Sequence, residues 1–361
     1  MRLVADSGLW STGAQVAQPE LVAVLEVSGA VLSWTVDDPT ADAQITFTDP
    51  ARADWLWRVL GEAGHATLAA ALDGRVPDAS LDVAGVNVAA ESLAPLRRLA
   101  LGHWLRRWWP ASQRDGIAAL DGALLDAEIA VLTAGVEDFF TDDTFDSDVT
   151  ALLRPHTAAL SALIHDGDPR VVELVRTCAD LADDVGVAFG EVDSVSRRRD
   201  DYALAAGRGA GGRSHGAIAA GVDSVNWAAV PPGVFDAAEN TVEWRVEATN
   251  GVANAVVRVE LSGSGLAAEI PVRLRSGDLE GAGALDADGL ATFALIDGRQ
   301  RPVSESIAWD HDWRSAKVTV GADVEESPET RERIRKFARA RMRGTSHDAF
   351  LAEILAAESD Y

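Results

Sequence analysis

Apolar residues change their spacing several times along this chain, and each change marks a predicted segment. In residues 1–90, two short apolar runs at 21–27 and 30–36 flank Ser28-Gly29, a pair that favours a tight turn between strands. Asp49-Pro50 follows and is typical of a helix start, because Asp accepts a backbone hydrogen bond and Pro fits the first helical turn. We therefore predict a small α/β unit over residues 1–90.

Residues 91–186 carry apolar residues three or four positions apart, which is the spacing of amphipathic helices. The first apolar stripe ends at Pro110, a residue that cannot continue a helix. Asp168-Pro169 begins the last predicted helix of this segment, and Gly186 ends it. Four such helices with short connections predict a helical domain over residues 91–186.

The pattern changes twice more towards the end of the chain. Residues 187–223 are rich in Gly and Arg, and we predict a linker or mobile loop there. Over residues 224–323 the apolar period becomes two, and Asn250-Gly251 is the strongest short signal for a hairpin turn. This segment is predicted to be an antiparallel β-sandwich, immunoglobulin-like or similar. Ser327-Pro328 then begins a basic helix, which a terminal helix follows within residues 324–361.

Together these segments predict an α+β multidomain protein with an N-terminal small α/β unit, a central helical domain, and a C-terminal β-sandwich followed by a helical segment.

Composition narrows the class of protein and its partners. The 361 residues include 57 Asp and Glu against 32 Lys and Arg, a formal net charge of −25. Because such a surface repels phosphate backbones, we do not expect nucleic acid as a partner. Only Lys317 and Lys336 are lysines, and this bias towards Arg indicates a gene from a high-GC bacterium.

The sequence also indicates the compartment. Cys178 is the only cysteine, so neither an intrachain disulfide nor a cysteine-based zinc site can form. The first residues lack the basic and apolar regions of a signal peptide. No run of about 18 apolar residues is present, so we expect no membrane span. A cytoplasmic protein is therefore expected.

Two basic segments with aromatic residues are candidate partner-binding surfaces. Residues 96–110 form a basic amphipathic stripe that suits an anionic membrane surface or a partner's groove, but we favour a helix packed on the core. Residues 331–343 hold seven basic residues and one acidic residue, a net charge of +6. This second segment suits an acidic partner or docking on the protein's own acidic residues 115–150, and we favour self-docking. The candidate partner-binding residues are Trp104, Arg106, Arg107, Trp108, Trp109, Arg335, Phe337 and Arg339.

Two further motifs support alternative functions. His156 and His165-Asp166 suggest a divalent metal in a hydrolase of the helical domain, although His156 and His165 lie nine positions apart, on opposite faces of an ideal helix. Residues 207–214 have the spacing of a phosphate-binding loop, but Arg213 stands where that loop needs Lys. Neither motif is complete, and we therefore assign no catalytic, cofactor-binding or metal residue.

The function that the sequence favours is a non-enzymatic bacterial scaffold, adaptor or accessory subunit of the cytoplasm that acts through contacts with one or more proteins. The alternatives are a metal-dependent hydrolase built around His156, His165 and Asp166, and a nucleotide-binding protein that uses the loop 207–214. No cofactor is expected for the favoured function.

Overall fold

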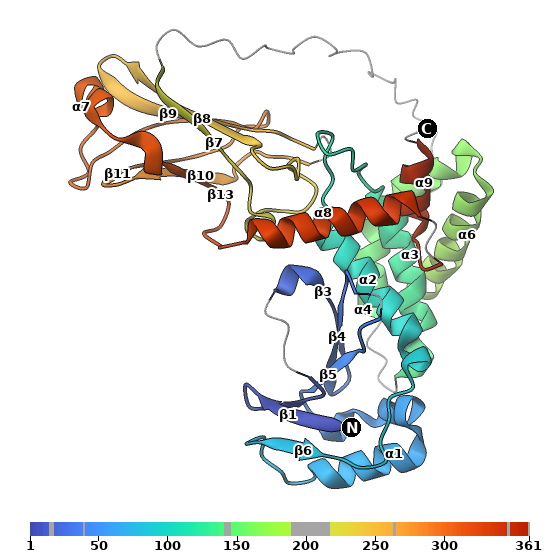
Figure 1. Cartoon of the computed structure of the whole chain (residues 1–361). Coiled ribbons are helices and arrows are strands. Elements are labelled where there is room, and N and C mark those ends of the chain that lie inside the picture. Colours follow the sequence, from blue (N-terminus) through green and yellow to red (C-terminus); the bar gives the residue numbers. More distant parts are fainter. Residues whose placement is uncertain are drawn as a thin grey trace. The chain divides into compact units, whose positions relative to one another are not determined.

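The computed structural model describes residues 1–13, 18–38, 40–140, 146–188, 217–262, 265–344 and 347–359 (Figure 1). The chain forms two compact units. Unit 1 comprises Met1–Trp109, Leu120–Val192 and Glu329–Tyr361, and unit 2 comprises Pro110–Ala119 and Asp193–Pro328. Helices and antiparallel sheets are mixed, which confirms the predicted α+β class. Within the described ranges, no helix combines the length and the apolar character needed to cross a membrane.

Unit 1 contains one antiparallel sheet with the strand order β3-β4-β5-β2-β1-β6. Its strands are β1 (Arg2–Asp6), β2 (Leu9–Ser11), β3 (Val22–Val27), β4 (Ala30–Thr35), β5 (Gln44–Phe47) and β6 (Ser80–Asp82). Ser28-Gly29 joins β3 to β4, as predicted. Gly29 has a positive φ of 73°, and a Cβ atom there would collide with the carbonyl oxygen of Asp49. Only glycine therefore fits this turn without strain.

Helices make up the rest of unit 1. They are α1 (Trp57–Leu72), α2 (Ala94–Trp108), α3 (Gly122–Gly135), α4 (Asp146–Leu153), α5 (Thr157–Leu163), α6 (Pro169–Asp184), α8 (Pro328–Arg343) and α9 (Leu351–Ser359). The predicted boundary at residues 90 and 91 falls inside this unit, where α2 packs on β3. Gly102 allows α2 to lie close to α3, because a Cβ atom there would be 2.8 Å from Cγ1 of Ile129.

Two predicted helix starts have different outcomes. The Asp168 side chain accepts a hydrogen bond from the backbone N–H of Arg170 at 2.8 Å, and α6 begins at Pro169 as predicted. The Asp49 side chain accepts the corresponding bond from the N–H of Ala51, but two short 3-10 turns, Pro50–Arg52 and Asp54–Leu56, follow instead of an α-helix. Helix α1 begins later, at Trp57, because Ala53 interrupts the helical conformation with a ψ of 45°.

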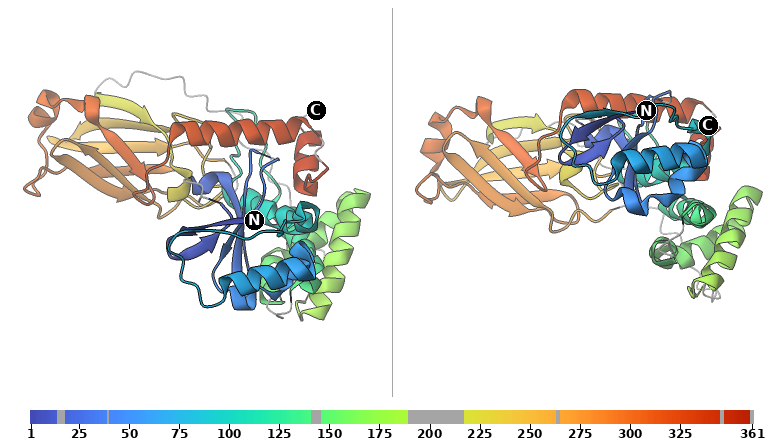
Figure 2. Two further views of the ribbon diagram at one scale, coloured as in Figure 1. Left: turned by 60° about the horizontal axis from the view of Figure 1, so that its bottom comes forward. Right: turned by 90° about the horizontal axis from the view of Figure 1, so that it is seen from below.

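Unit 2 contains two antiparallel sheets that share one hydrophobic core, as the views in Figure 2 show. The strands are β7 (Ala217–Asp223), β8 (Val242–Thr249), β9 (Val252–Val259), β10 (Pro271–Ser276), β11 (Leu279–Ala284), β12 (Leu290–Ala294) and β13 (Lys317–Val320), and the helix is α7 (Glu305–Asp310). Asn250 and Gly251 both have positive φ, 54° and 79°, which is what a tight two-residue hairpin turn requires. The predicted turn between β8 and β9 is therefore confirmed.

The strand order in unit 2 is β12-β9-β8-β7 in one sheet and β11-β10-β13 in the other. In immunoglobulin constant domains the second and third strands lie in opposite sheets, whereas β8 and β9 are direct neighbours here. This strand order therefore differs from that of an immunoglobulin constant domain. Where we predicted a linker up to residue 223, the structure has the edge strand β7 from Ala217 onwards, with Gly221 leaving room for the ring of Trp244.

Candidate functional site

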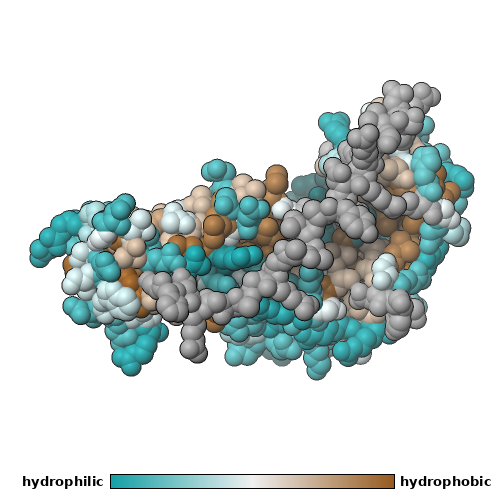
Figure 3. All heavy atoms as spheres, turned by 90° about the horizontal axis from the view of Figure 1, so that it is seen from above, coloured by the Kyte–Doolittle hydropathy of each residue, from teal (hydrophilic) through white to brown (hydrophobic). Residues whose placement is uncertain are grey.

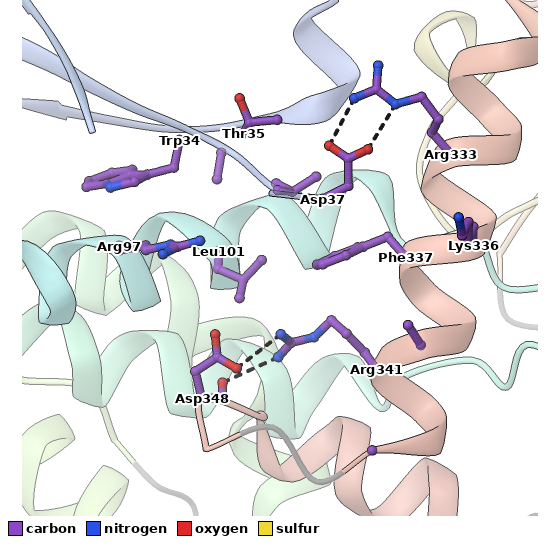
Figure 4. Close-up of a pocket in the computed structure, with 14 residues that line it drawn as sticks. Trp34, Thr35, Asp37, Arg97, Leu101, Arg333, Lys336, Phe337, Arg341 and Asp348 are labelled. Carbon is purple, nitrogen blue, oxygen red and sulfur yellow. Dashed lines mark hydrogen bonds and ion pairs between the residues drawn. The ribbon is translucent and has the colours of Figure 1, made fainter. Parts of the chain in front are cut away.

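A cavity of about 700 Å³ lies in unit 1 between strand β4 and helices α2 and α8 (Figure 4). Strand β4 and the residues after it contribute Trp34 and Asp37, while α2 contributes Arg97 and Leu101. The lining residues of α8 are Arg333, Lys336, Phe337, Ala340 and Arg341, which Gly344 follows. These positions are three or four residues apart, so they form one continuous face of the helix. The cavity therefore runs along α8 for about three turns.

Apolar packing holds α8 in this position. The ring of Phe337 lies edge-on to Trp104 of α2, with 5.4 Å between the ring centroids. Trp104 is only 2% exposed, and its indole N–H donates to the backbone carbonyl of Glu20 at 2.8 Å. Ile334 and Ala338 of α8 are fully buried. The basic helix therefore docks on its own chain through a narrow apolar stripe, as we expected.

Ion pairs fix the two ends of the same helix face. Arg333 binds the carboxylate of Asp37 through Nε at 2.9 Å and Nη2 at 3.1 Å. Arg341 binds the buried Glu353 of α9 through Nε and Nη2, and Asp348 through Nη1 at 3.2 Å. Burial works against the charge of Arg341, but the pairs with Glu353 and Asp348 raise its pKa above its usual value. These carboxylates lie outside residues 115–150, the surface that we predicted for this docking.

Two further cationic groups line the cavity, Lys336 on α8 and Arg97 on α2. Lys336 is exposed and makes no ion pair within the part of the chain that the structure describes. Arg97 donates from Nη2 to the carbonyl oxygen of Asp38 over a long 3.5 Å. With Arg333 and Arg341, the lining holds four cationic groups, against the three carboxylates of Asp37, Asp348 and the Glu353 that binds Arg341. The cavity is thus locally positive in a chain whose net charge is −25.

The floor between these charges is apolar. Leu101 and Phe337 face each other across the cavity in Figure 4, and Trp34 lies further along, beyond Arg97. Elsewhere, on the face that Figure 3 shows, apolar side chains lie in small groups among polar ones. An apolar floor with a positive margin favours a ligand that carries both acidic and apolar groups.

The candidate partner-binding residues of α2 lie in different surroundings from one another. Trp104 belongs to the core of unit 1. Arg106 pairs through Nε with the buried carboxylate of Asp126 at 2.8 Å. The guanidinium of Arg107 stacks on the ring of Trp108 at 4.3 Å, and Trp109 ends the helix half-buried. None of these residues lines the cavity.

Of the candidates on α8, Phe337 lines the cavity and the other two do not. Arg335 is buried and pairs with Glu332 at 3.2 Å. Arg339 approaches the same carboxylate at 3.6 Å. We missed Trp34, Asp37 and Arg97 as cavity residues. Arg97 belongs to the basic stripe of residues 96–110, but nothing in the sequence around Trp34 or Asp37 predicts that they line a cavity.

The motifs of the alternative functions gain no support from the described residues. Nε2 of His156 lies 3.0 Å from Oδ2 of Asp126, while His165 is exposed in a short 3-10 turn that includes Asp166. Across the described ranges, no group of three or more His, Cys, Asp or Glu side chains is placed to hold a metal ion. Residues 207–214 lie outside the described residues.

Comparison with models of protein families, with curated proteins and with solved structures finds no match for this chain. The geometry of the cavity is therefore the basis for assigning a function.

Proposed function

We propose that this protein is a non-enzymatic, cytoplasmic adaptor or accessory subunit, and that its cavity between β4, α2 and α8 receives an acidic, apolar segment of a partner protein. The observation that carries this proposal is the combination of an apolar floor at Trp34, Leu101 and Phe337 with a surplus of cations. In a chain with a net charge of −25, such a local surplus stands out from the rest of the surface.

The two parts of the lining have different tasks in this proposal. Burying one Leu or Phe side chain of a partner stabilises the complex by about 1.5–3 kcal/mol. An exposed ion pair contributes only about 0–1 kcal/mol, so Lys336 and Arg97 add little affinity by themselves. They do repel basic segments and favour acidic ones. The apolar floor therefore supplies most of the affinity, and the cations determine which segment is accepted.

Selection from a random dodecapeptide display library tests the proposal. The wild-type protein should enrich peptides in which Asp or Glu stands beside Leu, Phe or Trp. Lys336→Glu should lose this enrichment, because it reverses the charge in the middle of the cavity. Lys317→Glu is the matched control, since Lys317 is the other lysine of the chain and lies on β13 in unit 2. If no peptide class is enriched, or if Lys336→Glu enriches the same class as the wild type, the proposal is wrong.

A further inference from the structure

A second cavity, of about 510 Å³, adjoins the first one. It is lined by the beginning of the chain, by residues 40–43 and 86–88, and by the start of α2. Trp34 and Arg97 line both cavities. Figure 4 shows Arg97 between Trp34 and Leu101, so Trp34 and Arg97 mark the place where the two cavities meet.

One face of α2 runs along both cavities. The second cavity is lined by Ala90 and Leu93 of the 3-10 turn before α2 and by Ala94 and Arg97 of α2, and the first by Arg97 and Leu101. These positions are three or four residues apart and lie on one side of the helix. The two cavities therefore follow one another along α2. From Leu93 to Leu101 the helix rises about 12 Å, which is the length of about four residues of extended chain.

The second cavity offers backbone hydrogen-bonding groups as well as the charged side chains of Arg2, Asp42 and Arg97. Residues 86–88 lie in neither a helix nor a strand. The carbonyl oxygen of Val86 accepts a hydrogen bond from the amino group of Met1 at 2.9 Å. The backbone N–H groups of Asn87 and Val88 make no hydrogen bond within the described residues. Such groups are free to pair with the backbone of an extended peptide.

We propose that the partner segment is an extended acidic peptide that spans both cavities past Arg97. This inference rests on the proposed function and specifies the shape of its ligand. An apolar residue of the peptide lies on Leu101 and Phe337, while its carboxylates face Lys336 and Arg97. The adjoining peptide backbone then pairs with residues 86–88. A compact ligand would fill the first cavity alone, whereas a segment of more than about four residues reaches both.

Fluorescence anisotropy with fluorescein-labelled (Leu-Glu)2 and (Leu-Glu)4 peptides tests this inference. The eight-residue peptide should bind at least about tenfold more tightly than the four-residue peptide, because only the longer one reaches the second cavity. Ala94→Glu introduces bulk and negative charge into the second cavity alone. It should remove the advantage of the longer peptide and leave the shorter one unaffected. Ala159→Glu, at an exposed position of α5, is the matched control and should change neither affinity.

The outcomes separate this inference from the proposed function. If both peptides bind equally, or if Ala94→Glu weakens both to the same extent, the ligand does not span the two cavities. Sensitivity of the shorter peptide to Lys336→Glu would still support the proposed function in that case. If neither peptide binds, or if Lys336→Glu leaves both affinities unchanged, the proposed function is wrong as well.

Discussion

Helices α2 and α8 are built from the same kinds of residues but use them differently. Both combine arginines with an apolar stripe at helical spacing, which includes tryptophans in α2 and Phe337 in α8. In α2, Trp104 lies in the core and Arg106 neutralises a buried carboxylate. In α8, Phe337 and Lys336 border a cavity. A basic, aromatic stripe therefore indicates an amphipathic helix, but the packing opposite the stripe determines whether its residues form core or a binding site.

Ion pairs hold the two ends of α8, whereas its middle lines the cavity. The largest expected effect of a substitution on stability is at the C-terminal end of this helix. Arg341→Leu leaves the carboxylate of Glu353, which is 2% exposed, without its partner. Breaking a buried ion pair in this way costs about 3–5 kcal/mol of unfolding free energy. Urea unfolding followed by circular dichroism measures this loss.

The control for Arg341 is Arg343→Leu, at an exposed position two residues away. It should change the free energy of unfolding by less than about 0.5 kcal/mol. The double variant Arg341→Leu, Glu353→Leu should recover part of the loss, because no buried charge remains unpaired. If Arg341→Leu costs no more than Arg343→Leu, Arg341 does not anchor α9.

The aromatic pair at the contact between α2 and α8 should show the next largest difference. Trp104→Ala removes a fully buried side chain and should cost about 3–5 kcal/mol of unfolding free energy. Phe337→Ala removes a half-buried ring and should cost about 1–2 kcal/mol, roughly half the transfer energy of such a side chain plus its ring contact. If Trp104→Ala and Phe337→Ala lose the same amount of unfolding free energy, Phe337 is packed as fully as Trp104 and does not border a cavity.

A smaller, pH-dependent effect is expected at His103 on the core side of α2. Burial lowers the pKa of His103, and Arg106 lowers it further, while Asp126 and Asp148 act in the opposite direction. In the unfolded chain this histidine takes up a proton near the ordinary histidine pKa of 6.5, whereas the folded protein takes it up at a lower pH. Stability should therefore fall as the pH drops below 6.5, by at most about 1.4 kcal/mol per pH unit from this group.

His103→Gln should reduce the difference in unfolding free energy between pH 7.5 and pH 5.5, because glutamine does not titrate. His165→Gln is the control, since His165 is exposed on the surface. If the wild type and His103→Gln lose the same unfolding free energy on acidification, the burial of His103 does not cause the pH dependence.

Local features of the fold were predictable where a single residue type determines the backbone. Asn250-Gly251 marks the turn between β8 and β9, because both residues tolerate positive φ. Asp168-Pro169 marks the start of α6 through a capping hydrogen bond. The start of α1 was misplaced, because a capping bond at Asp49 secures only one turn and cannot show that Ala53 interrupts the helix.

The site itself was predictable only in part. Phe337 was a candidate because its helix is amphipathic and basic. Trp34 and Arg97 lie 63 positions apart, and they meet only because α2 packs on the sheet beside β4. The cavity arises from side chains that fail to fill the space between three elements. Such an incomplete packing leaves no pattern in any one of their sequences.

A charge-swap titration tests the central claim, that the cations of α8 select an acidic segment, most directly. The affinities of (Leu-Glu)4 and (Leu-Lys)4 are measured for the wild type, for Lys336→Glu on α8 and for Arg107→Glu on α2. We expect the wild type to prefer the acidic peptide by at least about tenfold, Lys336→Glu to lose most of this preference, and Arg107→Glu to keep it. Equal binding of the two peptides by the wild type, or an equal effect of Arg107→Glu and Lys336→Glu, would contradict the claim.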